Sequence, residues 1–113
     1  MGTIGSNTGL SLVRLSSSQL FAAYGYGSSG YLYGKVLTIS DSSISEGTAV
    51  ALSSTTNAGR VISAVALSST SVFIAHSYGS NQYLYGIVCT ISGTSITAGT
   101  DRSFAQNYTS RLQ

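Results

Sequence analysis

The sequence predicts an all-β fold made of two copies of one four-stranded antiparallel unit. Three observations predict it: a ten-residue segment occurs twice, β-branched and aromatic residues gather in short runs, and brief polar connections separate these runs. The chain of 113 residues has no proline and 42% hydrophobic residues, so it differs from the polar, highly charged chains that stay disordered. At this length it is expected to bury a core of its own.

The repeated segment is Tyr31–Ser40, which reads YLYGKVLTIS and returns at Tyr83–Ser92 as YLYGIVCTIS. A shift of 52 positions aligns residues 15–48 with residues 67–100 without a gap, and 20 of the 34 aligned pairs are identical. Internal repeats of about 20–50 residues usually stack against one another. We therefore predict two units, residues 9–60 and residues 61–113.

Each unit is predicted to contain four strands, because runs rich in β-branched and aromatic residues alternate with clusters of Gly, Ser, Asn and Asp. In the first unit the strands are Leu10–Leu15, Gln19–Tyr26, Tyr31–Ser40 and Ile44–Leu52. In the second they are Val61–Leu67, Ser71–Tyr78, Tyr83–Ser92 and Ser95–Phe104. Connections this short join antiparallel neighbours, since parallel strands need a long crossover. Each unit is therefore predicted to be a four-stranded meander.

The predicted strands are apolar on both faces. Successive side chains of a strand point to opposite sides, so Ser71–Tyr78 places Phe73 and Ala75 on one face and Val72 and Ile74 on the other. A strand that is apolar on both faces is covered on both faces. Four-stranded sheets stacked face to face around a central axis meet this requirement, and they are the blades of a β-propeller.

A sequence pattern spanning Leu10 to Phe104 carries a family resemblance. The pattern Leu-Ser-Ser-x-x-x-Phe-x-Ala, Tyr-Gly-Ser and Tyr-Leu-Tyr-Gly-x-Val-x-Thr-Ile-Ser-x-x-Ser-Ile resembles the propeller-type repeats in tail and structural proteins of phages and prophages of Gram-positive bacteria. The chain lacks the Trp of WD-type blades, the Gly-Gly pair of kelch blades and the Asp-box of bacterial sialidases. The resemblance implies blades and a virion-associated or extracellular location, which the sequence itself leaves open.

Two blades are too few for a closed propeller, which typically has about four to eight. An exposed sheet face rich in Leu, Ile, Val and Tyr is a contact surface. We expect the second unit of one chain to pack on the first unit of the next, a head-to-tail contact that closes into a ring. The expected homo-oligomer is a trimer with six blades; a dimer with four or a tetramer with eight are the alternatives. A chain that folds alone as a flat two-sheet sandwich is the contrasting possibility.

Tyrosines flank the loops that join the second and third strands of each unit. Aromatic rings with a hydroxyl at one edge suit sugars, and weak sites repeated around a ring gain avidity. We therefore predict a lectin-like, carbohydrate-binding rim, with strand-end packing of these side chains as the alternative. The candidate ligand-binding residues are Tyr24, Tyr26, Tyr31, His76, Tyr78, Asn81, Gln82 and Tyr83. A purely structural virion module or an engineered scaffold without a small ligand is the alternative function.

Composition argues against several other partners. Charged residues make up only 7% of the chain, and the net charge of +2 is spread along it, whereas nucleic-acid binding needs a clustered basic patch. No apolar run approaches the roughly 20 residues of a membrane span. Met1-Gly2-Thr3 lacks the basic and apolar regions of a signal peptide. We expect neither nucleic acid nor membrane as a partner.

We predict no enzymatic activity, no cofactor and no metal site. Glycoside hydrolysis usually needs two carboxylates at a set distance, but Asp41, Glu46 and Asp101 are expected on turns or outer strands. His76, the only histidine, aligns with Tyr24 and is expected to pack like an aromatic residue. Cys89 aligns with Leu37 and is expected to act as a small buried hydrophobe.

Overall fold

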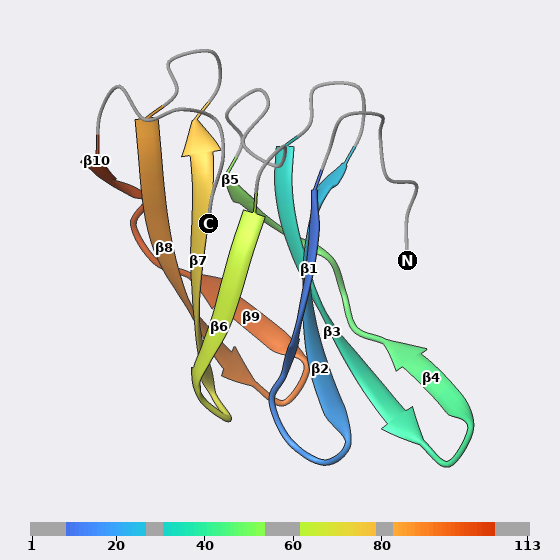
Figure 1. The fold of residues 1–113 in the computed structure, drawn as a ribbon. Coiled ribbons are helices and arrows are strands. Elements are labelled where there is room, and N and C mark those ends of the chain that lie inside the picture. Colours follow the sequence, from blue (N-terminus) through green and yellow to red (C-terminus); the bar gives the residue numbers. More distant parts are fainter. Residues whose placement is uncertain (1–8, 27–30, 54–61, 79–82, 106–113) are drawn as a thin grey trace.

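The computed structural model describes residues 9–26, 31–53, 62–78 and 83–105, which form ten β-strands in two antiparallel sheets (Figure 1). These described residues contain no helix. The prediction of an all-β fold with two antiparallel sheets is therefore confirmed. Each sheet lies within one of the two predicted units.

The first sheet contains a meander with a divided outer strand. Its strands are β1 (Leu10–Arg14), β2 (Gln19–Tyr26), β3 (Tyr31–Ser40), β4 (Ser43–Glu46) and β5 (Val50–Ser53). The order is β1-β2-β3-β4, and β5 also pairs with β3. Because β2 occupies one edge of β3 along most of its length, β4 and β5 share the other edge.

The second sheet repeats this arrangement. Its strands are β6 (Ile62–Ser68), β7 (Ser71–Tyr78), β8 (Tyr83–Ser92), β9 (Ser95–Ala98) and β10 (Arg102–Ala105). Strands β6, β7 and β8 are successive neighbours, and both β9 and β10 pair with β8. The internal repeat in the sequence is therefore a repeat of sheet topology.

The outer strand of each unit was predicted to be continuous, as Ile44–Leu52 and Ser95–Phe104, and this prediction is wrong. Each is divided around a glycine whose amide donates to the neighbouring long strand: Gly47 to the Val36 carbonyl and Gly99 to the Val88 carbonyl, both at 2.8 Å. A Cβ atom at Gly99 would lie 2.7 Å from the Val88 carbonyl oxygen. A residue with a side chain would therefore force the backbones apart.

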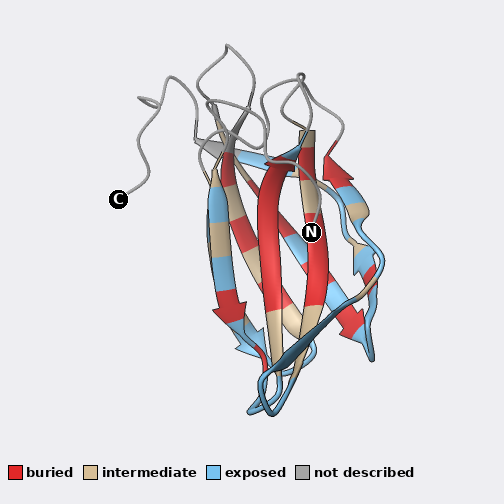
Figure 2. Cartoon of the chain, turned by 90° about the vertical axis from the view of Figure 1, so that its right-hand side faces the viewer, coloured by how far each residue is buried: buried red, intermediate tan, exposed pale blue. Residues whose placement is uncertain are grey.

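The two sheets pack through unlike faces. We call the side of the first sheet that carries Val13, Leu15, Phe21 and Val36 the Phe21 face, and the side of the second sheet that carries Ala64, Val72, Ile74, Ile87 and Cys89 the Ile74 face. Residues of both faces form one hydrophobic core. Strand β6 lies against β1 and β2, and β9 lies against β3. Figure 2 shows the buried residues as a band along the central strands.

This packing has a direction. Ile74 aligns with Ala22 in the repeat, and Ala22 lies on the side of the first sheet opposite the Phe21 face, because neighbouring residues of a strand alternate between faces. The second sheet is therefore stacked on the first in the same orientation. In an ordinary β-sandwich each sheet has one apolar face, and these two apolar faces pack on each other.

Candidate functional site

The head-to-tail stacking leaves one face of each sheet outside the junction, and this outer face of the second sheet repeats a buried face of the first. Val65, Leu67, Phe73 and Val88, which we call the Phe73 face, are the repeat counterparts of Val13, Leu15, Phe21 and Val36 and are the same residue types. In the first unit these residues are at most 9% exposed. In the second unit Val65, Leu67 and Val88 are 54%, 61% and 43% exposed.

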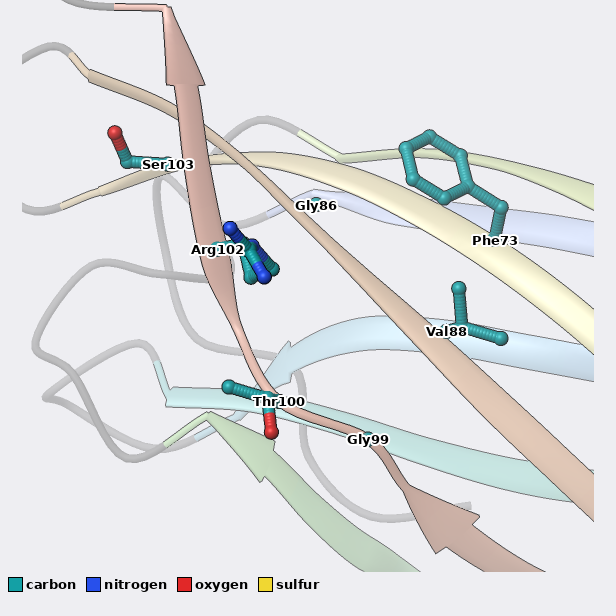
Figure 3. Close-up of a pocket in the computed structure, with 7 residues that line it drawn as sticks. All are labelled: Phe73, Gly86, Val88, Gly99, Thr100, Arg102 and Ser103. Atoms are coloured by element: carbon teal, nitrogen blue, oxygen red, sulfur yellow. The ribbon is translucent and has the colours of Figure 1, made fainter.

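The Phe73 face is also hollowed. A space of about 530 Å³ is lined by Phe73, Gly86, Val88, Gly99, Thr100, Arg102 and Ser103 (Figure 3). Phe73 pairs with Val88 across β7 and β8, and Val65 of β6 pairs with Phe73. The exposed apolar side chains therefore neighbour one another on three adjacent strands, as in an interaction surface.

The face of the first sheet that lies outside the junction carries Leu10, Leu12, Tyr24, Tyr33 and Lys35, and we call it the Tyr24 face; Tyr24 and Lys35 on it are buried. Leu10 and Leu12 are about half exposed, and they pair with Tyr24 and Ala22 of β2. This face is the repeat counterpart of the Ile74 face, with polar residues at some of its positions. Each end of the molecule therefore presents the counterpart of one side of its internal junction.

Three tyrosines cluster on the Tyr24 face. Tyr24 and Tyr33 are direct cross-strand partners, and Tyr26 follows two residues along the same side of β2. The ring centroids are 6.2 Å apart for Tyr24–Tyr33, 6.4 Å for Tyr24–Tyr26 and 5.3 Å for Tyr26–Tyr33. With Lys35 and Ala49, these rings line a hollow of about 190 Å³. Burial raises the pKa of the Tyr24 hydroxyl above its ordinary value, so this group stays protonated at neutral pH.

An ion pair lies beside the tyrosine cluster. Lys35 Nζ donates to Glu46 Oε1 at 2.6 Å. The hydrogen bond from Lys35 lowers the pKa of Glu46 to about 2, and the same bond raises the pKa of Lys35. Sequence reasoning missed this pair. The sequence signal for the pair is that both positions differ between the units, since Lys35 and Glu46 align with Ile87 and Ala98.

His76 lies inside the junction between the sheets. It is fully buried, its ring stacks on Tyr85 at a centroid distance of 6.0 Å, and its Nε2 lies 2.9 Å from Asp101 Oδ1. The expectation that His76 packs like an aromatic residue is confirmed. The sequence analysis did not identify Asp101 as the partner of His76. Here too both positions differ between the units, since His76 and Asp101 align with Tyr24 and Ala49.

The predicted ligand-binding residues that the structure describes lie in both sheets. Tyr24 and Tyr26 meet in the tyrosine cluster, where Tyr24 is buried and Tyr26 is 40% exposed. Tyr31 pairs with Tyr26 at the end of β3, whereas His76 lies in the other sheet. Tyr78 pairs with Tyr83 through the backbone at the ends of β7 and β8. Asn81 and Gln82 lie outside the described residues.

Cys89 occupies the Ile74 face as a buried side chain, which confirms its predicted structural role. Burial raises the pKa of its thiol from 9.0 to about 11. The thiol is therefore neutral at physiological pH, and the reactive species, the thiolate, is scarce.

We expect the Cys89 thiol of the native chain to resist a disulfide reagent such as DTNB at mildly alkaline pH and to react fully after unfolding. Because the folded-state pKa is the higher one, the stability contributed by the protonated thiol is present below the unfolded pKa near 9 and is lost as the pH rises toward 11. The labelling rate across a urea series would measure this protection. Immediate stoichiometric labelling of the native chain would contradict it.

The three acidic residues of the chain all lie in its described part. Asp41 lies on the turn between β3 and β4, while Glu46 and Asp101 contact Lys35 and His76. Among the residues that the structure describes, no group of three or more His, Cys, Asp or Glu could hold a metal ion. Within the same residues, no helix is long and apolar enough to cross a membrane.

Comparison of the chain with protein-family models, with curated protein sequences and with solved structures found no match in any of the three.

Proposed function

We propose that this chain is a non-enzymatic module whose function is to assemble with copies of itself, head to tail, into a closed β-propeller. One observation carries the proposal. Val13, Leu15 and Val36 are buried on the Phe21 face, whereas their counterparts on the Phe73 face, Val65, Leu67 and Val88, are 54%, 61% and 43% exposed. A neighbouring chain that offers its Tyr24 face would cover the Phe73 face as the Ile74 face covers the Phe21 face.

A contact between unlike faces extends until it closes, because each added chain presents the same open pair again. Each chain contributes two sheets, so a closed ring has an even number of blades. Three chains would give six blades, within the usual range of about four to eight. A dimer and a tetramer meet the same rule, and the resemblance to phage tail repeats favours a building block of a virion.

Native mass spectrometry and light scattering at micromolar concentration test the proposal. The expected mass is about 35 kDa, three times the 11.6 kDa of one chain. The matched control is Val88→Asp, which places a charge on the Phe73 face and is expected to give a folded monomer. A wild-type chain that stays monomeric throughout the micromolar range would overturn the proposal.

A second candidate function is carbohydrate binding at the tyrosine cluster. The observation that favours it is the hollow of about 190 Å³ between Tyr26, Tyr33 and Lys35. Aromatic rings offer contact to the CH-rich faces of sugars, and the hydroxyl and ammonium groups offer hydrogen bonds. In the proposed ring this cluster borders the neighbouring chain, so ligand and partner would meet there.

Titration of the assembled protein with monosaccharides by NMR, together with a glycan array, tests this second function. Binding that is lost in Tyr26→Ala while the assembly mass is unchanged would support it. An assembled ring that binds no monosaccharide at millimolar concentration and no arrayed glycan would leave the purely structural role.

A further inference from the structure

The internal junction contains a turn seated against a neighbouring sheet. The turn between β8 and β9 is formed by Gly93 and Thr94. Gln19 Nε2 donates to the Gly93 carbonyl oxygen at 3.3 Å. A Cβ atom at Gly47 would lie 3.1 Å from Thr94 Cβ and 3.2 Å from the Thr94 carbonyl oxygen. The Gly93–Thr94 turn of the second unit therefore contacts Gly47, at the point where the outer strand of the first unit divides.

The corresponding position in the second unit is the hollow of the Phe73 face. Its lining residues Phe73, Gly86, Val88 and Gly99 are the counterparts of Phe21, Gly34, Val36 and Gly47. Figure 3 shows Phe73 and Val88 at one side of this space and Thr100 and Arg102 at the other. The second unit thus has a space of about 530 Å³ beside Gly99, where the first unit receives a turn beside Gly47.

The chain also carries a turn that matches this space. Asp41 and Ser42, between β3 and β4, align with Gly93 and Thr94, and both are exposed. Asp41 has a φ of 55° and Gly93 a φ of 61°, so both turns use a left-handed residue at the same position. The exposed turn of the first unit therefore has the backbone shape of the turn that is already seated.

We propose that the hollow of the Phe73 face is a socket for the Asp41–Ser42 turn of a neighbouring copy of this chain, and that Ser42 then lies beside Gly99, as Thr94 lies beside Gly47. This inference rests on the self-association proposed above and adds the contact that selects which faces meet. Asp41 on the turn and Arg102 in the lining of the socket carry opposite charges, whereas the residues aligned with them at the internal junction, Gly93 and Val50, carry none. Opposite charges on two surfaces favour their association in this register.

Charge reversal tests the attraction between Asp41 and Arg102. Arg102→Glu places two acidic groups together, Asp41→Lys places two basic groups together, and the double variant restores an attractive pair in reversed order. Each single variant is expected to weaken the association by about tenfold, and the double variant is expected to return to within about threefold of the wild type, as for other charge pairs at interfaces. Sedimentation equilibrium measures the association, and far-UV circular dichroism checks that every variant is folded.

Disulfide trapping gives a second measurement that does not depend on charge. Ser42→Cys together with Thr100→Cys is expected to form, on mild oxidation, a ladder of linked chains on a denaturing gel. Either substitution alone is expected to give no ladder, because a single cysteine at each head-to-tail contact has no partner. The native Cys89 is buried and is expected to stay unreacted.

The outcomes distinguish the socket from the self-association on which it rests. A wild-type chain that never associates overturns self-association and the socket together. A wild type that associates, with charge variants that associate equally well and no disulfide ladder, overturns the socket alone. Single variants that weaken association without rescue in the double variant overturn the attraction between Asp41 and Arg102.

Discussion

Replacing Phe21 with alanine is expected to lower the free energy of unfolding by about 3–5 kcal/mol, the usual range for deleting a buried phenylalanine side chain. Phe21 is fully buried in the core between the sheets. Its ring lies over Gly34, where a Cβ atom would come within 2.8 Å of Phe21 Cζ. The ring therefore fills space that a smaller side chain would leave as a cavity. Urea unfolding followed by circular dichroism measures the loss.

Phe73→Ala is the matched control, because the same residue type occupies the aligned position on the open Phe73 face. The monomer is expected to lose less free energy of unfolding than in Phe21→Ala, since Val65 and Val88 beside Phe73 are already exposed. Its association should weaken instead. Equal losses of monomer stability from the two substitutions would show that the two faces are buried alike, contrary to the head-to-tail stacking.

The second large effect is expected from Ile87→Lys. Ile87 is 1% exposed on the Ile74 face, and its repeat counterpart is Lys35, which the first unit pairs with Glu46. A lysine at position 87 would find Ala98 where the first unit has Glu46, and Asp101 already contacts His76. A buried charge without a partner destabilises a protein by about 3–5 kcal/mol, so the variant should unfold at much lower urea concentration.

Ala98→Glu added to Ile87→Lys copies the ion pair of the first unit into the second. The double variant is expected to recover part of the lost stability, because the new carboxylate can accept a hydrogen bond from the lysine. The recovery should be incomplete, since the Glu46 side chain is 43% exposed, whereas the second pair would lie inside the junction. A double variant less stable than Ile87→Lys would mean that the geometry of the pair does not transfer between the units.

Much of the fold could be predicted because the patterns that produce its strands and turns are local in the sequence and occur in both units. Successive apolar residues such as Phe21 and Ala22, both fully buried, mark a strand covered on both sides, and short loops allow only antiparallel neighbours. The divided outer strands could not be predicted, because Gly47 and Gly99 look like ordinary strand glycines until the carbonyl groups of Val36 and Val88 are placed beside them.

The site was predicted less well, because its contacts depend on register between strands. Lys35 meets Glu46 across the hairpin of β3 and β4, and His76 meets Asp101, which lies 25 residues further along the chain. Tyr24 meets Tyr33 through the register of β2 and β3. The available signal was a comparison of the two units. At each of the two polar contacts, both partners differ from the residues aligned with them in the other unit.

The division of the outer strands also bears on whether another chain can add to the sheets at that edge. On the side of β3 and β8 away from β2 and β7, the edge of each sheet consists of two strands of four residues. A long, straight edge offers a row of unpaired backbone groups on which another chain can add as a new strand, the first step toward amyloid. An edge interrupted at Gly47 or Gly99 offers only short segments, so fibril growth is disfavoured.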